Sequence, residues 1–523
     1  MIRNFLIATT QHLSRLRRLA ACLNVLLSTL ALVGCASFSP DGGMTVVADV
    51  ASETIRKDVV LIRTTEDAEW ARDEVKRLLR RTLTVDSFVQ IALLNNRGLQ
   101  AAYNELALAE ADLIRDSLPP NPKFSILRIA GEGAIEIERQ IVGDILALAT
   151  LPFRSEIARQ RFQEAQLRAA EDTLRLAAEV RRAYYRAVGA NELVGILNEA
   201  KTTGEATAQL ALKLGQTGAM NKLDQAREQV FYAETTAELA TLRQEATSSR
   251  ERLSRLLGLW DGDLGFRLPQ KLPALPRIAY SLPRIEVDAV EHRLDLQIAR
   301  IELAALAKTL NLTEASRFVT VLDVAGIDRK TKDPDTRPFR EHGFDVQFQI
   351  PIFDGGEVRI RQATETYNQA FNLLTEKAVN VRSEARDAYR VYRSTYDVAR
   401  HYQREVLPLR KIITDELQLR FGSMQVDVFA LLTEARQRIV ALRAACCGRS
   451  HARLLACAIG VADGGERRWR RGDASAKAAF DHAGERCEEL NATNHLPAGL
   501  ARGRGTESDK AKPTRNIGGG TFE

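Results

Sequence analysis

The sequence has 523 residues, of which 45% are hydrophobic and 27% are charged, which are the proportions of a globular protein with a buried core. At this length two or three domains are expected. The formal net charge is only +6 and the arginines are dispersed over helical stretches, which excludes the concentrated basic face of a nucleic-acid-binding protein. After residue 34 the sequence has no run of 18 consecutive apolar residues, so no transmembrane helix is expected in the mature chain.

The first 34 residues have the pattern of a bacterial export signal. Three arginines precede an apolar run over residues 19–33, which is too short to span a bilayer comfortably. The run ends in the letters LVGC, which resemble the lipoprotein box whose cysteine is acylated and becomes the mature N-terminus. This resemblance predicts removal of residues 1–34, lipidation of Cys35, and a lipidated tether with a short helix over residues 35–83. An ordinary signal peptide with a chance cysteine is the alternative.

From residue 84 onward the same order of elements occurs twice. Each copy begins with a helix, continues with strand-like segments and a very long helix, and returns through a glycine turn into another long helix. The first copy occupies residues 84–260 and the second occupies residues 284–445. Between them, residues 261–283 are rich in proline and are predicted to form an exposed linker.

Prolines and glycines at matching places delimit the predicted helices, as Pro152 and Pro351 do before the two long helices. We expect helices over residues 84–113, 152–214, from the Gly218 turn to 257, over 286–310, after Pro351, and from about Val426.

The long helices carry an apolar seam with coiled-coil spacing. A helix over residues 152–214 would extend about 95 Å at about 1.5 Å per residue, which no compact domain requires. Pro408 has no amide donor, so the second long helix is predicted to kink or restart there. In the second copy the seam consists of Ile360, Ala363, Tyr367, Ala370, Leu374, Ala378, Val381, Ala385, Ala388, Tyr392, Thr395 and Ala399.

Period-two alternation predicts strands that a soluble coiled coil would not need. Over residues 344–350 apolar residues alternate with Asp and Gln, and residues 318–324 are the expected hairpin partner. Residues 124–129 and 135–141 are their weaker counterparts in the first copy. Four strands cannot close a membrane barrel, because exposed strand edges are not tolerated in lipid. Several protomers are therefore predicted to pool their strands.

With these features the chain resembles the TolC family of outer-membrane efflux ducts, particularly the lipoprotein branch that serves tripartite resistance-nodulation-division pumps. The resemblance is carried by residues 91–125, 256–273 and 348–363 and by the glycine tips, and it covers about residues 84–445. It implies a mainly α fold with a small β part. In that fold a homotrimer forms a long α-helical coiled-coil barrel, and four strands per protomer contribute to a 12-stranded outer-membrane β-barrel.

The resemblance also implies partners and a location. The expected partners are a periplasmic adaptor (membrane fusion) protein, an inner-membrane pump of the resistance-nodulation-division type, and outer-membrane lipid, with no nucleic acid, no metal and no cofactor. The chain would be lipid-anchored in the outer membrane with a long periplasmic extension.

Two helical tips are the candidate sites that the resemblance places on this chain. Leu214 and Gly218 mark the first adaptor-contacting tip, and Leu419 and Gly422 mark the second. Beyond the tips, Asp224 and Asp427 are the candidate acids of a closing aperture, although Asp427 sits one residue nearer its glycine than Asp224 does. The alternative for both aspartates is a solvated acid that the helix dipole favours near a helix N-terminus.

The sequence departs from the family after Ala445. The return helix should continue, but residues 446–523 lose the hydrophobic period. We expect this tail to be disordered or poorly packed, as a frameshifted C-terminus would be. The alternative is a metal site, although its spacing fits no structural zinc pattern. That site would comprise Cys446, Cys447, His451, Cys457 and Cys487.

No catalytic constellation is present in the two copies, which contain no Ser-His-Asp grouping and no Walker glycine loop. We therefore expect no enzyme activity. The sequence predicts the passive exit duct of a tripartite efflux system, which would export drugs or metal ions as its pump delivers them. The alternative is a structural coiled-coil periplasmic lipoprotein without a pore.

Overall fold

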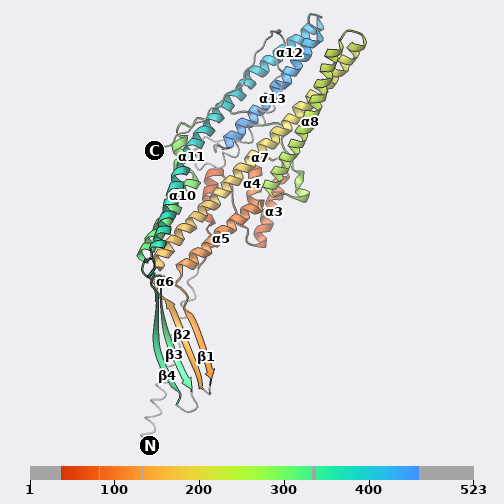
Figure 1. Ribbon diagram of the computed structural model, residues 1–523. Helices are drawn as coiled ribbons and strands as arrows, with labels where there is room; N and C mark the ends of the chain where they lie inside the picture. Colours follow the sequence, from red (N-terminus) through yellow and green to blue (C-terminus); the bar gives the residue numbers. More distant parts are fainter. Residues whose placement is uncertain (1–36, 82, 132–133, 333–336, 459–523) are drawn as a thin grey trace, which may run out of the picture. The chain divides into compact units, whose positions relative to one another are not determined.

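The computed structural model describes residues 37–458 except 82, 132–133 and 333–336. The export signal at 1–34, Cys35 and the tail from 459 onward, with Cys487, lie outside the described residues. Two structural repeats follow one another, as the sequence predicted, after two short N-terminal helices (Figure 1). Those helices are α2 (Met44–Ile55) and α3 (Thr65–Leu79).

Each repeat has a helical pair, a β-hairpin and a long helical hairpin, in that order. The first repeat comprises α4 (Val85–Asn95), α5 (Arg97–Ser117), β1 (Lys123–Gly131), β2 (Ala134–Asp144), α6 (Ile145–Ala149), α7 (Leu151–Gln216) and α8 (Lys222–Leu257). The second comprises α9 (Ile285–His292), α10 (Leu294–Ala315), β3 (Val321–Lys332), β4 (Phe339–Gln349), α11 (Glu357–His401), the π-helical turn η2 (Tyr402–Val406), α12 (Leu407–Gly422) and α13 (Val428–Ala458). A short 3₁₀ helix, η1 (Asp261–Gly265), begins the connection between them.

The first helix of each repeat is broken in the same place, where the sequence predicted one continuous helix. Asn96 has an extended backbone between α4 and α5, and its side-chain oxygen accepts the Leu99 amide at 3.0 Å. This N-cap starts a new helix. Arg293 has the corresponding position between α9 and α10 and pairs with Asp295 at 2.9 Å. Apolar periodicity continues across both breaks, so the pattern alone did not reveal them.

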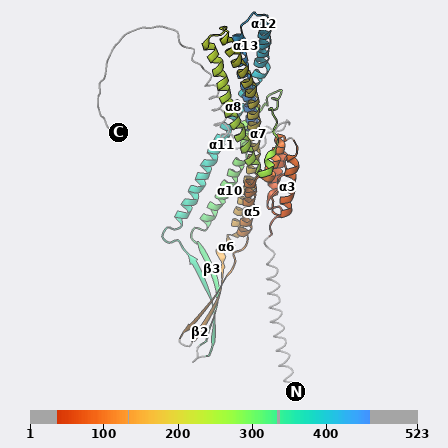
Figure 2. The ribbon, with the colours of Figure 1, turned by 90° about the vertical axis from the view of Figure 1, so that its right-hand side faces the viewer.

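The four strands form one antiparallel sheet in the order β1-β2-β3-β4, so each repeat contributes a hairpin and β2 pairs with β3 across the repeats. β3 runs to Lys332, well beyond the predicted end at residue 324, because its charged distal half still pairs in register with β2 and β4. Short α6 connects β2 to α7 and also contacts β3. Figures 1 and 2 show α10 and α11 leaving the sheet side by side.

The long helices match the predicted seam. α7 has 66 residues and would measure about 100 Å along its axis. In the second repeat, α11, η2 and α12 follow one another as the counterpart of α7, and Pro408 stands in the first turn of α12. The π-helical turn that ends two residues before Pro408 is where this long helix accommodates a residue without an amide donor. The predicted interruption at Pro408 is confirmed.

The linker is packed, contrary to the exposed linker that its prolines suggested. Phe266, Leu272 and Ala279 are at most 7% exposed. The ring of Phe266 lies 5.4 Å from that of Phe88, edge to face, and the Leu272 amide donates to Glu192 at 2.9 Å. Prolines here shape an extended segment whose apolar side chains close the core over α4 and α7.

The N-terminal segment is also fixed from Ser39 onward, which leaves little length for the expected tether. The Ser39 amide donates to Glu110 at 2.7 Å. Asp41 accepts hydrogen bonds from the side chain and amide of Thr45, which lower the pKa of Asp41 to about 2. Gly43 lies against the ring of Phe162 at a φ of 80°, where a Cβ would clash with that ring.

The expectation of poor packing after Ala445 is wrong for residues 446–458, which continue α13. Cys446 is fully buried, and Arg449 pairs with Glu192 at 2.6 Å. The Arg453 guanidinium donates to the carbonyl of Ala274 in the linker. The small residues Ala445, Ala452 and Ala456 keep the helix close to its neighbours, and the polar residues that interrupt the hydrophobic period, such as Arg449 and Arg453, are paired or hydrogen-bonded.

Replacing Phe266 by alanine tests whether the linker belongs to the core. Loss of a buried ring should destabilise the fold by roughly 3 kcal/mol, lower the melting temperature and open the linker to trypsin. Trp260→Ala is the matched control, because Trp260 is 80% exposed in the same connection and should change the stability by less than about 0.5 kcal/mol. Equal effects of the two substitutions would contradict a packed linker.

Candidate channel-forming surfaces

The sheet has one strongly apolar face. Register places Phe124, Ile141, Gly326 and Phe344 side by side across the four strands. The next rows towards the helices hold Val324 with Val346 and Leu322 with Phe348. Phe344 is 82% exposed, so nothing within the described residues covers this face. A face of exposed large apolar side chains is unfavourable in water and favourable in lipid.

The opposite face is more polar: it carries most of the acids of the sheet, together with exposed Leu127, Ile129 and Phe339. Alternate residues of the same strands include Glu136, Glu138, Asp323 and Asp345, and Arg329 pairs with both glutamates. A sheet with one apolar and one polar face has the pattern of a barrel wall between lipid and water.

Both outer edges of the sheet are open within the described residues. β1 pairs only with β2, and β4 pairs only with β3. An edge strand presents a row of unpaired amide and carbonyl groups, which demand a partner wherever water is excluded. The apolar face and the open edges therefore belong to one interface.

The first helical tip joins α7 to α8. Gly218 has a φ of 75°, which glycine adopts without strain, and Leu214 is half-buried beneath the turn with its carbonyl accepting two amides. Asn221 caps α8 by accepting the Asp224 amide at 2.9 Å. The Asp224 carboxylate is partly covered: it accepts from the Asn221 side chain at 2.6 Å and pairs with Arg227 at 3.0 Å.

The second tip joins α12 to α13 and turns at a different residue from the one predicted. Gly422 is the last residue of α12, and the left-handed position is Met424, with a φ of 59° and 95% exposure. Leu419 is 71% exposed, one turn before the tip. A methionine held at positive φ is mildly strained, and its exposure leaves the side chain available for contact.

The two candidate acids are not equivalent. Matching the turns by their hydrogen bonds aligns Gly218 with Met424, and hence Asn221 with Asp427. Asp427 acts as Asn221 does, since it accepts the amide three residues on, from Ala430 at 2.9 Å. The counterpart of Asp224 is therefore an alanine. Aligning Gly218 with Gly422 conceals this two-residue shift between the tips. Aligning the helix N-cap residues Asn221 and Asp427 would have revealed it.

Ion pairs fix α13 against its neighbours near the tips, which the sequence analysis missed. Arg436 pairs with buried Glu228 of α8 at 2.7 Å, and Arg410 of α12 pairs with buried Glu434 at 2.8 Å. Arg436 also lies over the ring of Phe231, 4.5 Å from its centroid. Because a buried carboxylate is costly without a partner, these pairs set the spacing of the two hairpins.

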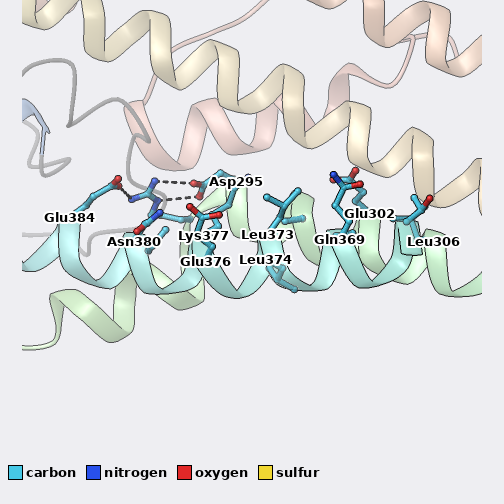
Figure 3. A pocket seen from close by; sticks show the side chains of 15 residues that line it. Asp295, Glu302, Leu306, Gln369, Leu373, Leu374, Glu376, Lys377, Asn380 and Glu384 are labelled. Carbon is cyan, nitrogen blue, oxygen red and sulfur yellow. Dashed lines mark hydrogen bonds and ion pairs between the residues drawn. The ribbon is translucent and has the colours of Figure 1, made fainter. Parts of the chain in front are cut away.

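A cavity of about 560 Å³ lies between α10 and α11 (Figure 3). Arg293 lines the cavity and bonds Asp295 at 2.9 Å and Glu384 at 3.0 Å, so the charge of Arg293 is already matched. On α7, burial and the nearby Asp295 raise the pKa of Glu171. The remaining lining mixes aliphatic and polar side chains without a convergent set of donors, so the cavity indicates no specific ligand.

The cysteines of α13 do not assemble a metal site in the described part of the chain, where no three metal-ligating side chains come together. Burial, together with nearby Glu192, raises the pKa of Cys446 to about 12, so its thiol stays protonated at neutral pH and is a poor metal ligand. Burial also lowers the pKa of His451. Cys447 and Cys457 lie on the same helix at intermediate exposure.

Among the described residues, no helix is both long and apolar enough to span a bilayer.

Comparison with solved structures identifies the architecture. CusC matches with a TM-score of 0.59 and 17% identity over 75% of this chain and 92% of its own, in a study of transmembrane channel formation. The fold of the described residues is thus similar to the fold of CusC. The outer-membrane channel OprN matches with a TM-score of 0.59 and 18% identity over 82% of this chain and 97% of its own. The outer membrane protein VceC of Vibrio cholerae matches with a TM-score of 0.60 and 12% identity over 76% and 97%.

At these identities the likeness concerns the fold. It includes the long helices and the small sheet predicted from the sequence. No family model and no curated protein sequence matches the chain.

Proposed function

We propose that this protein is the outer-membrane exit duct of a tripartite efflux system and belongs to the TolC family. One observation carries the proposal: a four-stranded sheet with an apolar face and two open edges is joined directly to helices about 100 Å long. A wall of this kind is incomplete alone. Copies joined β4 to β1 close a barrel without edges, and three copies give twelve strands.

The helices continue the barrel as a tunnel in the periplasm. The sheet presents a continuous apolar face, and we place this sheet in the outer membrane. The lipid at Cys35 would add an anchor beside the barrel. The tips at Gly218 and Met424 are then farthest from the membrane, where a periplasmic adaptor and an inner-membrane pump would dock. Exposed Leu419 and Met424 supply apolar contacts for the adaptor.

Transport through such a duct is passive, with no catalysis and no cofactor, and the pump supplies the energy. Drugs and metal ions are the cargo classes that the family resemblance suggests. A structural coiled-coil lipoprotein without a pore would not need an apolar sheet face. Ion conduction across a bilayer therefore distinguishes an exit duct from a structural lipoprotein.

Recording from planar bilayers tests the proposal. Purified full-length protein should insert as trimers and give discrete, long-lived conductance steps that scale with salt concentration. Protein heated until the trimer dissociates serves as the control and should give none. A stable monomer that leaves the bilayer silent would overturn the duct and favour the structural lipoprotein.

Asp224 and Asp427 are proposed to line the periplasmic aperture, where three copies would gather six carboxylates. An acidic ring attracts cations, so the open pore should be cation-selective. Asp224→Asn with Asp427→Asn should reduce the cation-to-anion permeability ratio severalfold, because Asn removes the charge and still caps α13. Reversal potentials in a salt gradient measure this ratio.

The matched control for this substitution is Glu205→Gln with Asp415→Asn. It removes the same charge from exposed acids farther from the two turns. An unchanged permeability ratio in the aspartate variant would show that these residues face away from the pore.

A further inference from the structure

The apolar face of the sheet ends in a belt of basic residues at the end of the strands away from the helices. Beyond the row of Phe124 and Phe344, the next row holds Arg139, Asp328 and His342 beside Ile126. The row after that holds Arg128, Lys330 and Arg340, and Lys332 follows on β3. All of these residues share the face of the phenylalanines. We call them the basic belt.

The charge of the basic belt is mostly unmatched. Its one acid in the described strands, Asp328, accepts two hydrogen bonds of 2.6 Å from Arg340 and lies 3.7 Å from Arg139. Arg128 and Lys330 are exposed and have no ion-pair partner among the described residues. Five arginines and lysines thus stand beside one carboxylate on this face.

This asymmetry is specific to the apolar face. The opposite face of the described strands has the reverse balance, with Lys123 and Arg329 as its bases. Its acids are Glu136, Glu138, Asp144, Asp323, Glu341 and Asp345. A charge pattern that served only solubility would not separate the signs by face.

Assembly does not neutralise the belt. If β4 of one copy pairs with β1 of the next copy, the new neighbours of Arg128 on this face are the β4 residues of the adjoining copy. At the distal end of β4 these are Arg340 and His342, both basic. In the closed barrel every strand therefore contributes one basic residue to a ring, namely Arg128, Arg139, Lys330 and Arg340.

The belt lies at the height of a membrane boundary. Ten residues separate Ile350, just after β4, from Arg340, a path of about 34 Å along an extended strand. At a tilt of about 40° this path rises roughly 26 Å, close to the 25 Å apolar band of outer-membrane barrels. The helices leave the sheet at the other end, so the belt lies at the outer leaflet.

We infer that the basic belt binds the phosphate groups of a phosphorylated lipid of the outer leaflet, whose acyl chains lie along the apolar rows below. The inference rests on the proposed function, since it needs the sheet in a membrane. Arginine forks bind phosphate oxygens bidentately, and lysine adds a point charge. The ligand is amphiphilic because cations and exposed apolar side chains occur on one continuous face.

Lipid binding by the purified full-length protein in neutral detergent tests the inference. Native mass spectrometry would measure retention of bisphosphorylated lipid A and of the same lipid after removal of both phosphates. Arg128→Gln with Lys330→Gln should weaken binding of the phosphorylated lipid about twenty-five-fold, since each basic residue contributes roughly fivefold. The dephosphorylated lipid should bind weakly and equally to wild type and variant.

Lys123→Gln with Arg329→Gln is the matched control, because it removes the same charges from the same two strands on the opposite face. It should bind the phosphorylated lipid as wild type does. Equal affinity of the belt variant and wild type would overturn the inference, as would equal loss in the control. Conductance in neutral lipid bilayers tests the duct separately, so a conducting protein without phosphate preference would refute only the lipid site.

Discussion

Backbone groups along the outer edges of β1 and β4 have no partner within the described chain, and the side chains on one face of the same sheet are apolar. In lipid, an unpaired amide or carbonyl costs several kcal/mol, so such a sheet enters a membrane only when the edges are closed. The need to satisfy the edges makes assembly a condition of membrane insertion. In the duct that we propose, copies joined edge to edge meet this need.

The helical part extends from one end of the sheet. α7 begins next to the sheet and ends at the first tip, so one element connects the sheet, the core and that tip. The core around Phe88 and Tyr184 is closed by the linker, which joins the two repeats rather than merely separating them. Ion pairs such as Arg436–Glu228 hold α13 to the first repeat at the tip end. Loss of such a pair would let the two hairpins move relative to each other.

The features that were predicted correctly from the sequence are those that a local residue pattern encodes. Strand alternation, the seam of the long helices and the interruption at Pro408 all depend on local pattern, and the structure bears them out. Features decided by tertiary contact were missed. Asn96 and Arg293 break helices through bonds to distant residues or buried acids, and the linker prolines hid a packed Phe266.

At the candidate sites, the sequence did not determine how the residues of the second tip align with those of the first. Glycine positions placed the tips to within two residues, but the turn in the second tip uses Met424, and this shift makes Asp427 the counterpart of Asn221. The helix after Ala445 was misjudged because alanines and a buried cysteine pack well without a strong apolar period. Lipidation at Cys35 stays a prediction.

Disulfide trapping between β1 and β4 tests the central claim most directly. Within one chain these strands are separated by about 14 Å, too far for a disulfide, so any bond must join two copies. Ser125→Cys would be combined in turn with Asp345→Cys, Gln347→Cys or Gln349→Cys, after alanine replaces the native cysteines beyond residue 445. In outer-membrane fractions one register should oxidise to dimers and trimers and stop at three. Monomers at every register, or an open-ended ladder of larger species, would contradict the account.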